Sequence, residues 1–314
     1  MNRWPPRPSL SRSFYKAHGL GNDYLVFEEG YGWEATPENI GRVCDRFRGV
    51  GADGIVVLSA PDRAPPDRGA SDGPLEVWLR MFNPDGGEFE RSGNGLRILA
   101  SYLARKDAAL RRIVAHVGGD RVAMTVHGRE GPRHDISVDM GNASTGPVAI
   151  AGDEAAFERR DSGSWLLAGP EEERLVVVPV SVGNPHLVVL ATDLDDFSAA
   201  RLAQLGPFLT QHPSLRFGAN VQLARAGGGK TCQALIWERG VGRTSASGTS
   251  SCAVAVAMVA SGRMTSGDIS VEMPGGTLSV SVTDDLHVIL RGPVEEAMEG
   301  DLSEALLATF ERAP

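Results

Sequence analysis

Apolar and polar residues alternate along much of the chain in short runs that end at glycine-rich turns, a pattern typical of β-strands joined by tight turns. One such run, Leu75 to Phe82, leads through a polar turn to the stretch Ser92-Gly93-Asn94-Gly95. An apolar segment of helical character then continues to Arg105. The pattern predicts a strand, a tight Ser-Gly corner and a helix that begins at this corner.

A second stretch repeats this order. The apolar run that ends at Trp237 passes through a glycine-bearing turn to Ser247-Gly248-Thr249, and an apolar segment of helical length follows. Because the segment from Cys252 to Ala260 is apolar on every face, we expect strands to enclose it.

The two stretches belong to a longer repeat. Gly21-Asn22 and Gly183-Asn184 each lie between apolar runs, and Asn22 precedes Ser92 by 70 positions while Asn184 precedes Ser247 by 63. Similar units in one chain indicate duplication. We therefore expect an α+β fold in which each half is a mostly antiparallel sheet wrapped around one central helix.

The length of 314 residues suits two domains of ordinary size. The first 13 residues are rich in Pro, Arg and Ser and lack the apolar region of a signal peptide. We expect residues 1–13 to form a disordered extension, residues 14–143 to form the first half and residues 144–293 to form the second.

Composition narrows the range of partners. A net charge of -9 and a pI near 5.3 argue against a nucleic-acid partner. The sequence has no stretch of the roughly 20 apolar residues that a membrane helix needs. We expect a cytoplasmic protein that does not bind a membrane.

The chain also lacks the common signatures of metal and cofactor sites. The three cysteines, Cys44, Cys232 and Cys252, form no CxxC pair, and we expect them to be buried free thiols. The seven histidines show no HExxH spacing, and no GxGxxG follows a strand with an acidic residue about 20 positions later. We expect no metal and no cofactor.

The two corners suggest a chemistry. A helix N-terminus has backbone N–H groups without helical acceptors and the positive end of the helix dipole, so it can bind a carboxylate or phosphate. One such corner is weak evidence, since glycines at helix starts are more often plain turn formers. If the two halves face one another, however, Ser92 and Ser247 can address opposite faces of one carbon, which is the geometry for inverting a stereocentre.

Polar side chains gather near the same strand ends. Asparagines there are commonly turn formers, but several that face one cleft would provide a hydrogen-bonding cage for amino and carboxylate groups. Arg239 is either an ordinary surface residue or a bidentate ligand for a second carboxylate. The candidate residues are Asn22, Asn83, Asn94, Asn184, His186, Asn220, Glu238 and Arg239.

From Phe14 to about Val294 the chain resembles the diaminopimelate epimerase family, which interconverts LL- and meso-diaminopimelate without a cofactor in lysine and peptidoglycan synthesis. The resemblance implies two pseudosymmetric domains with the active site in the cleft between them, residues 294–314 returning to the first domain, and a homodimer. It is carried by His18-Gly19-Leu20-Gly21-Asn22-Asp23, Phe82-Asn83-Pro84-Asp85-Gly86, Ser92-Gly93-Asn94-Gly95-Leu96-Arg97, Gly183-Asn184-Pro185-His186, Glu238-Arg239-Gly240 and Pro274-Gly275-Gly276.

The resemblance also implies roles. The substrate would be held by Asn22, Asn83, Asn184, Asn220 and Arg239. The carboxylate at the reacting centre would accept hydrogen bonds from the backbone of Gly93, Asn94, Gly248 and Thr249. His186 and Glu238 would orient or activate the two catalytic bases.

The sequence departs from the family at these bases. The family has a cysteine at each corner, where this chain has Ser92 and Ser247. A thiol ionises near a pKa of about 8.5, and lower at a helix N-terminus, whereas a serine hydroxyl needs a neighbouring base. Gly54 is a second departure, because some family members have a polar side chain there.

Three interpretations follow from the serines. The chain is a diaminopimelate epimerase with serine at both base positions, which binds substrate but turns it over slowly. Alternatively, it is a relative that uses its hydroxyls with His186 and Glu238 on another amino acid or a related acid. The third interpretation is an amino-acid binding protein without catalysis.

Overall fold

The computed structural model describes residues 8–59, 73–89, 92–160, 163–191 and 196–310, and the chain divides into two compact units. Unit 1 comprises residues 1–138 and 293–314, and unit 2 comprises residues 139–292. The chain passes between the units within two long strands, β9 (Arg133–Asn142) and β20 (His287–Asp301).

Unit 1 opens with strands and adds two longer helices and one short one. Its elements besides β9 and the end of β20 are β1 (Ser9–Gly19), β2 (Asn22–Glu29), β3 (Trp33–Glu34), α1 (Pro37–Cys44), β4 (Ile55–Ser59), β5 (Leu75–Phe82), β6 (Glu88–Phe89), α2 (Gly93–Lys106), β7 (Arg112–Val117), β8 (Asp120–Glu130) and α5 (Glu304–Leu307).

Unit 2 begins with short elements and continues with longer strands. Its elements are β10 (Ser144–Thr145), η1 (Pro147–Ile150), η2 (Glu154–Ala156), β11 (Glu158–Arg159), β12 (Trp165–Ala168), η3 (Pro170–Glu172), β13 (Arg174–Ser181), β14 (Pro185–Leu190), α3 (Ala199–Thr210), β15 (Asn220–Ala226), β16 (Thr231–Glu238), β17 (Gly242–Thr244), α4 (Gly248–Ala260), β18 (Gly267–Met273), β19 (Gly276–Val282) and the start of β20.

The two units have the same strand pairing. In unit 1, β1 to β2 is antiparallel, β2 to β4 parallel, β4 to β5 antiparallel, β5 to β7 parallel, and β7 to β8 and β8 to β9 antiparallel. In unit 2 the same order joins β13, β14, β15, β16, β18, β19 and β20. The predicted α+β fold with two pseudosymmetric, mostly antiparallel halves is confirmed.

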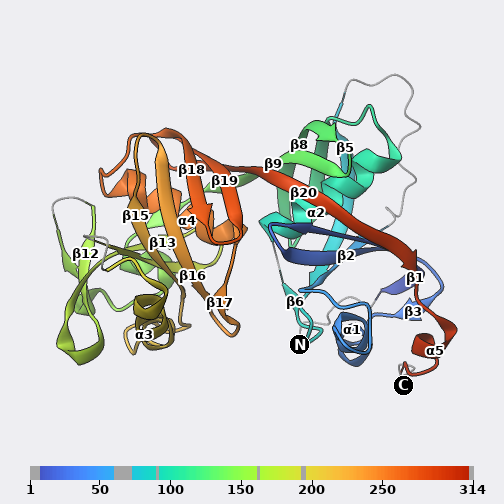
Figure 1. Ribbon diagram of the computed structural model, residues 1–314, viewed down its shortest axis with the longest axis horizontal. Coiled ribbons are helices and arrows are strands. Elements are labelled where there is room, and N and C mark those ends of the chain that lie inside the picture. The colour runs from blue at the N-terminus through green and yellow to red at the C-terminus, as the bar shows by residue number, and fades with distance from the viewer. Residues whose placement is uncertain (1–7, 60–72, 90–91, 161–162, 192–195, 311–314) are drawn as a thin grey trace. The chain divides into compact units, whose positions relative to one another are not determined.

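Each unit is built around one buried helix. Helix α4 packs against β13, β14, β15, β16, β18 and β19. Figure 1 shows it beside β13, β15, β16, β18 and β19. Its residues 250–258 are buried on all sides, as the uniformly apolar segment predicted. Helix α2 takes the equivalent place in unit 1, where it contacts β1, β2, β4 and β8. Both central helices therefore begin where a Ser-Gly corner was predicted.

A second helix covers the outer face of each sheet. Helix α1 links the parallel strands β2 and β4 and buries Ile40 and Val43 against Phe27. Helix α3 links β14 and β15 in the same way and buries Leu205 against Val221. A crossover helix is the usual connection between parallel strands, and it leaves the central helix enclosed on the other face.

The expectation of a disordered extension over residues 1–13 is wrong from Ser9 onward. Strand β1 begins at Ser9, and Leu10 pairs with Glu29 of β2 and Trp33 of β3. Leu10 is fully buried, and side-chain bonds from Arg12 to Glu304 and from Ser13 to Asp301 also hold this segment. Residues 1–7 lie outside the described part of the chain.

The enclosure of α4 predicts its tolerance to larger side chains. Ala255 is 0% exposed, so Ala255→Leu should overpack unit 2 and lower the free energy of unfolding by about 1–3 kcal/mol. Urea unfolding followed by circular dichroism measures this change. The matched control is Ala200→Leu at an exposed position of α3, which should change stability by less than about 0.5 kcal/mol. Equal effects of the two substitutions would mean that α4 is not enclosed.

Candidate functional site

The corner of unit 1 is the N-terminus of α2. Ser92 is the N-cap, with φ -129° and ψ 121°, and its Oγ accepts a hydrogen bond of 3.1 Å from the N–H of Gly95. The N–H groups of Gly93 and Asn94 lie in the first turn, where no preceding turn offers carbonyl acceptors. The corner can therefore donate backbone hydrogen bonds to an anion, and the α2 dipole adds to the attraction.

A buried side-chain network fixes this corner against the turn after β1. Asn94 Nδ2 donates to Asn22 Oδ1 at 2.6 Å and to the Asn22 carbonyl at 3.0 Å. The guanidinium of Arg97, which is fully buried, donates to Asn94 Oδ1. A Cβ at Gly19 would lie 2.2 Å from Asn94 Oδ1, so only glycine leaves room for this network. Asn94 thus uses its side chain inside the protein, and its backbone remains its means of binding a ligand.

Charged groups hold Asn22 from the other side. Asn22 Nδ2 donates to Asp53 Oδ2 at 2.8 Å, and Arg46 bridges Asp53 to Asp23 through bonds of 2.6 and 2.7 Å. Burial raises the pKa of Asp23, but hydrogen bonds from Arg46 and Lys16 outweigh this effect, and the pKa lies below its usual value. Asp53 and Arg97 were not among the site residues predicted from the sequence.

Asn83 and Gly54 lie at neighbouring strand ends of the same unit. Asn83 is exposed, and its N–H donates to the Gly87 carbonyl at 2.9 Å to close the turn after β5. A Cβ at Gly54 would meet the ring of Tyr24 at 2.5 Å, so the tyrosine fills the space beside this position. The structure joins Asn22 to the corner through side-chain bonds and leaves the Asn83 side chain at the surface.

The corner of unit 2 is capped differently. Ser247 is the N-cap of α4, with φ -154° and ψ 131°, and its side chain makes no capping hydrogen bond. Its carbonyl accepts from the N–H of Ser251 at 3.0 Å and from Ser251 Oγ at 2.8 Å. Gly248 is buried and Thr249 half-buried in the first turn. The hydroxyl of Ser247 is thus not committed to its own helix, in contrast to that of Ser92.

His186 is fully buried beneath this corner. Its Nε2 lies 2.8 Å from Asn184 Oδ1, and its Nδ1 lies 3.0 Å from Gln222 Nε2, which also donates to Ser250 Oγ at 3.0 Å. Burial lowers the pKa of His186 to about 3, and the nearby charge of Arg239 contributes to this lowering. His186 is therefore a neutral imidazole at physiological pH. Sequence reasoning missed Gln222 and Ser250.

Three further predicted residues lie at the same end of unit 2. Asn220 aligns with His186 in the parallel pairing of β14 and β15, and its Oδ1 accepts from the Arg239 N–H at 3.0 Å. Arg239 is exposed and donates through Nη1 to the Phe217 carbonyl. Glu238 is half-buried at the last position of β16. The structure therefore links Asn184 and His186 through Gln222 to the first turn of α4, and it places Asn220 beside His186 and Arg239.

The cysteines offer no alternative bases. All three are buried free thiols, as predicted, and burial raises the pKa of both Cys44 and Cys232 to about 12. Among the residues that the structure describes, no cluster of three or more His, Cys, Asp or Glu side chains could hold a metal ion. No helix in the described ranges is long and apolar enough to cross a membrane.

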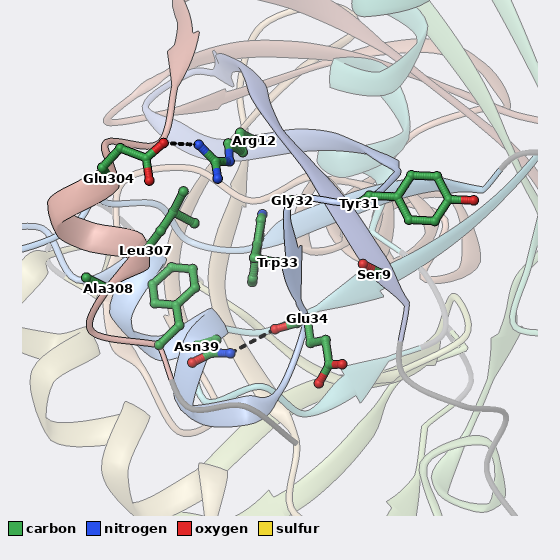
Figure 2. A pocket seen from close by; sticks show the side chains of 11 residues that line it. Ser9, Arg12, Tyr31, Gly32, Trp33, Glu34, Asn39, Glu304, Leu307 and Ala308 are labelled. Atoms are coloured by element: carbon green, nitrogen blue, oxygen red, sulfur yellow. Dashed lines mark hydrogen bonds and ion pairs between the residues drawn. The ribbon is translucent and has the colours of Figure 1, made fainter. Parts of the chain in front are cut away.

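Unit 1 also contains a pocket of about 460 Å³ beside β1, β3 and α5, shown in Figure 2. Trp33, Leu307 and Phe310 form its apolar wall, and an ion pair between Arg12 and Glu304 lies at its edge. None of its lining residues is among the predicted site residues.

Comparison with known proteins agrees with this arrangement. Residues 14–146 and 178–296 match the family model described as diaminopimelate epimerase. Proteins named diaminopimelate epimerase are 37% identical over 297 residues in Desulforudis audaxviator, covering 91% of this chain and 98% of the relative, and 35% identical over 301 residues in Synechococcus elongatus, covering 94% and 100%.

Solved structures share the fold. A predicted epimerase from Pseudomonas aeruginosa has a TM-score of 0.64 at 18% identity and covers 93% of this chain and 99% of its own. A hydroxyproline epimerase from Agrobacterium vitis, with bound trans-4-hydroxy-L-proline, has a TM-score of 0.58 at 14% identity and covers 96% and 93%. By the extent of the sequence match and the doubled sheet with its capped helices, the chain belongs to the diaminopimelate epimerase family of isomerases.

Proposed function

We propose that the protein binds diaminopimelate in a cofactor-independent site of the two-base type, and that Ser92 and Ser247 occupy the positions of the two bases. Turnover of LL- and meso-diaminopimelate is then slow, because neither base position has a thiol. The proposed halves are residues 14–143 with 294–314 and residues 144–293. A homodimer, a cytoplasmic location and the absence of a cofactor remain predictions.

The observation that carries this proposal is the equivalence of the two corners. Ser92 and Ser247 are the N-cap residues of the two central helices. Helix α2 follows the antiparallel strands β4 and β5, and α4 follows the equivalent strands β15 and β16. In the proposed complex the substrate carboxylate accepts hydrogen bonds from Gly93, Asn94, Gly248 and Thr249. Two helix N-termini on one carboxylate stabilise the negative charge that grows when the α-proton leaves.

The polar residues around the corners support a substrate with two amino-acid ends. In the proposal Asn22, Asn83, Asn184 and Asn220 hold amino and carboxylate groups, and Arg239 binds the carboxylate that is far from the reacting carbon. The exposed guanidinium of Arg239 suits this role, since a charge-assisted pair with a carboxylate is among the stronger hydrogen bonds that a protein forms. Glu238 and His186 orient the groups that act on the substrate.

The environment of the serines supports slow chemistry. A serine becomes a proton acceptor when a neighbouring base takes its own proton. Within the described residues, Ser92 Oγ accepts a bond from Gly95 N–H, and Ser247 Oγ has no side-chain capping bond. Both nitrogens of His186 are occupied by Asn184 and Gln222, so the imidazole does not activate Ser247. These contacts favour the slow epimerase over a relative in which serine is activated by histidine.

Replacing Ser92 and Ser247 together by cysteine should accelerate exchange of the substrate α-proton by about 10²–10⁴-fold, the usual contribution of a positioned acid or base. Mass spectrometry of meso-diaminopimelate incubated with the protein in deuterated water measures this exchange. The double variant should also require a reductant, because two facing thiols can oxidise.

The single variants Ser92→Cys and Ser247→Cys are the matched controls, and each should remain well below the double variant because two-base inversion needs both groups. An inert double variant together with tighter binding of a different amino acid would contradict the proposed substrate. If the protein binds no amino acid at all, the whole proposal is contradicted.

Arg239 should contribute to affinity more than to chemistry. Arg239→Met removes a charge-assisted hydrogen bond of about 1.5–3 kcal/mol and should raise the Kd for meso-diaminopimelate about 10- to 100-fold, as measured by titration calorimetry. The control is Arg243→Met, which removes an exposed arginine of the adjacent strand β17. If both variants bind as tightly as the unmodified protein, Arg239 does not contact the ligand.

A further inference from the structure

His186 lies at the centre of a hydrogen-bond chain that runs from the surface into the core of unit 2. Asn184 at the outer end is half-buried, whereas His186, Gln222 and Ser250 are all 0% exposed. His186 and Gln222 are diagonal neighbours on the parallel strands β14 and β15, and Ser250 belongs to the first turn of α4. The chain therefore connects Asn184 to the start of the central helix.

The contacts of the ring agree on one protonation state. A neutral imidazole has one N–H donor and one acceptor nitrogen. Nε2 is 2.8 Å from the oxygen of Asn184 and must donate, while Nδ1 is 3.0 Å from the amino group of Gln222 and must accept. A second proton on Nδ1 would point at the N–H groups of Gln222, so the geometry opposes the imidazolium form.

The opposite tautomer would require both amides to be turned over. Gln222 now satisfies both N–H bonds, to His186 and Ser250, and only its Oε1 lacks a hydrogen-bond partner among the described residues. If the Gln222 amide were rotated by about 180°, its amino group would take the place of Oε1. Both of its buried N–H groups would then lack acceptors. Unsatisfied buried donors are costly, so the orientation that leaves one carbonyl oxygen unpaired is preferred.

The geometry points to Gln222 as a positioning residue that holds His186 as the neutral Nε2–H tautomer, so that His186 fixes Asn184 and is not a catalytic base. Because His186 occupies Asn184 Oδ1, the Nδ2 group of Asn184 is the end that is available to a ligand. The Asn184 amino group can only donate hydrogen bonds, so the ligand atom that it contacts is an acceptor such as a carboxylate oxygen. This last step rests on the proposed function, whereas the tautomer does not.

Nitrogen NMR of the unmodified protein tests the tautomer directly. In protein labelled with ¹⁵N-histidine, correlations between ring protons and nitrogens distinguish Nε2–H, Nδ1–H and doubly protonated rings, and His186→Gln identifies the signal. We expect His186 to keep the Nε2–H pattern from about pH 5 to about pH 8, where an unperturbed histidine changes charge. Free imidazole in the same sample reports the pH. A His186 ring that becomes cationic or changes tautomer within this range would overturn the assignment.

A substitution tests the part played by Gln222. Gln222→Glu keeps the size of the side chain but offers Nδ1 an acceptor, so the His186 ring should become doubly protonated at neutral pH. Gln211→Glu, an exposed glutamine at the end of α3, is the matched control and should leave the His186 signal unchanged. An unaltered ring in Gln222→Glu would show that Gln222 does not set the tautomer.

Affinity for meso-diaminopimelate separates this inference from the proposed function. We expect Gln222→Glu to raise the Kd at least tenfold and Gln211→Glu to leave it unchanged. If the unmodified protein shows the expected ring pattern but binds no diaminopimelate, the proposed function fails and the tautomer assignment stands. If Gln222→Glu changes the ring but not the affinity, the link from His186 through Asn184 to the ligand is wrong.

Discussion

The first turn of a buried helix has backbone N–H groups that need acceptors from outside the helix. The protein contains two such turns, at the starts of α2 and α4, in two units with the same order of strand pairing. At α2 the Ser92 hydroxyl satisfies one donor, whereas the Ser247 hydroxyl satisfies none at α4. The start of α4 therefore needs an acceptor from outside the helix more than the start of α2 does.

The two corners are supported by different chemistry. In unit 1, Asn94 and Asn22 are held by buried or paired charges, Arg97 on one side and Asp53 with Arg46 on the other. In unit 2 the support is neutral and passes through His186 and Gln222 to α4. Because His186 stays neutral in the pH range where histidines ordinarily titrate, we expect the unit 2 corner to keep its hydrogen-bond pattern across that range.

Much of the fold could be predicted from the sequence because its strongest patterns are local. The uniformly apolar segment after Cys252 predicts an enclosed helix, and the run from Leu75 to Phe82 is strand β5. Residues whose roles depend on distant partners could not be found in this way. The guanidinium of Arg97 is buried beside Asn94 and the turn at Gly19, and the buried Gln222 contacts His186 on the neighbouring strand. The start of β1 was missed because its anchors, which include strand pairing with β2 and β3 and side-chain bonds from Arg12 and Ser13 to Glu304 and Asp301, are distant in the sequence.

The most direct test of the account is a crystal structure of the protein with meso-diaminopimelate bound. The account predicts one ligand carboxylate at the N–H groups of both helix starts, with Ser92 Oγ and Ser247 Oγ on opposite sides of the adjacent carbon at about 3–3.5 Å, the separation of reacting atoms. A ligand that contacts one helix start alone, or that lies in the pocket beside Trp33, would contradict it.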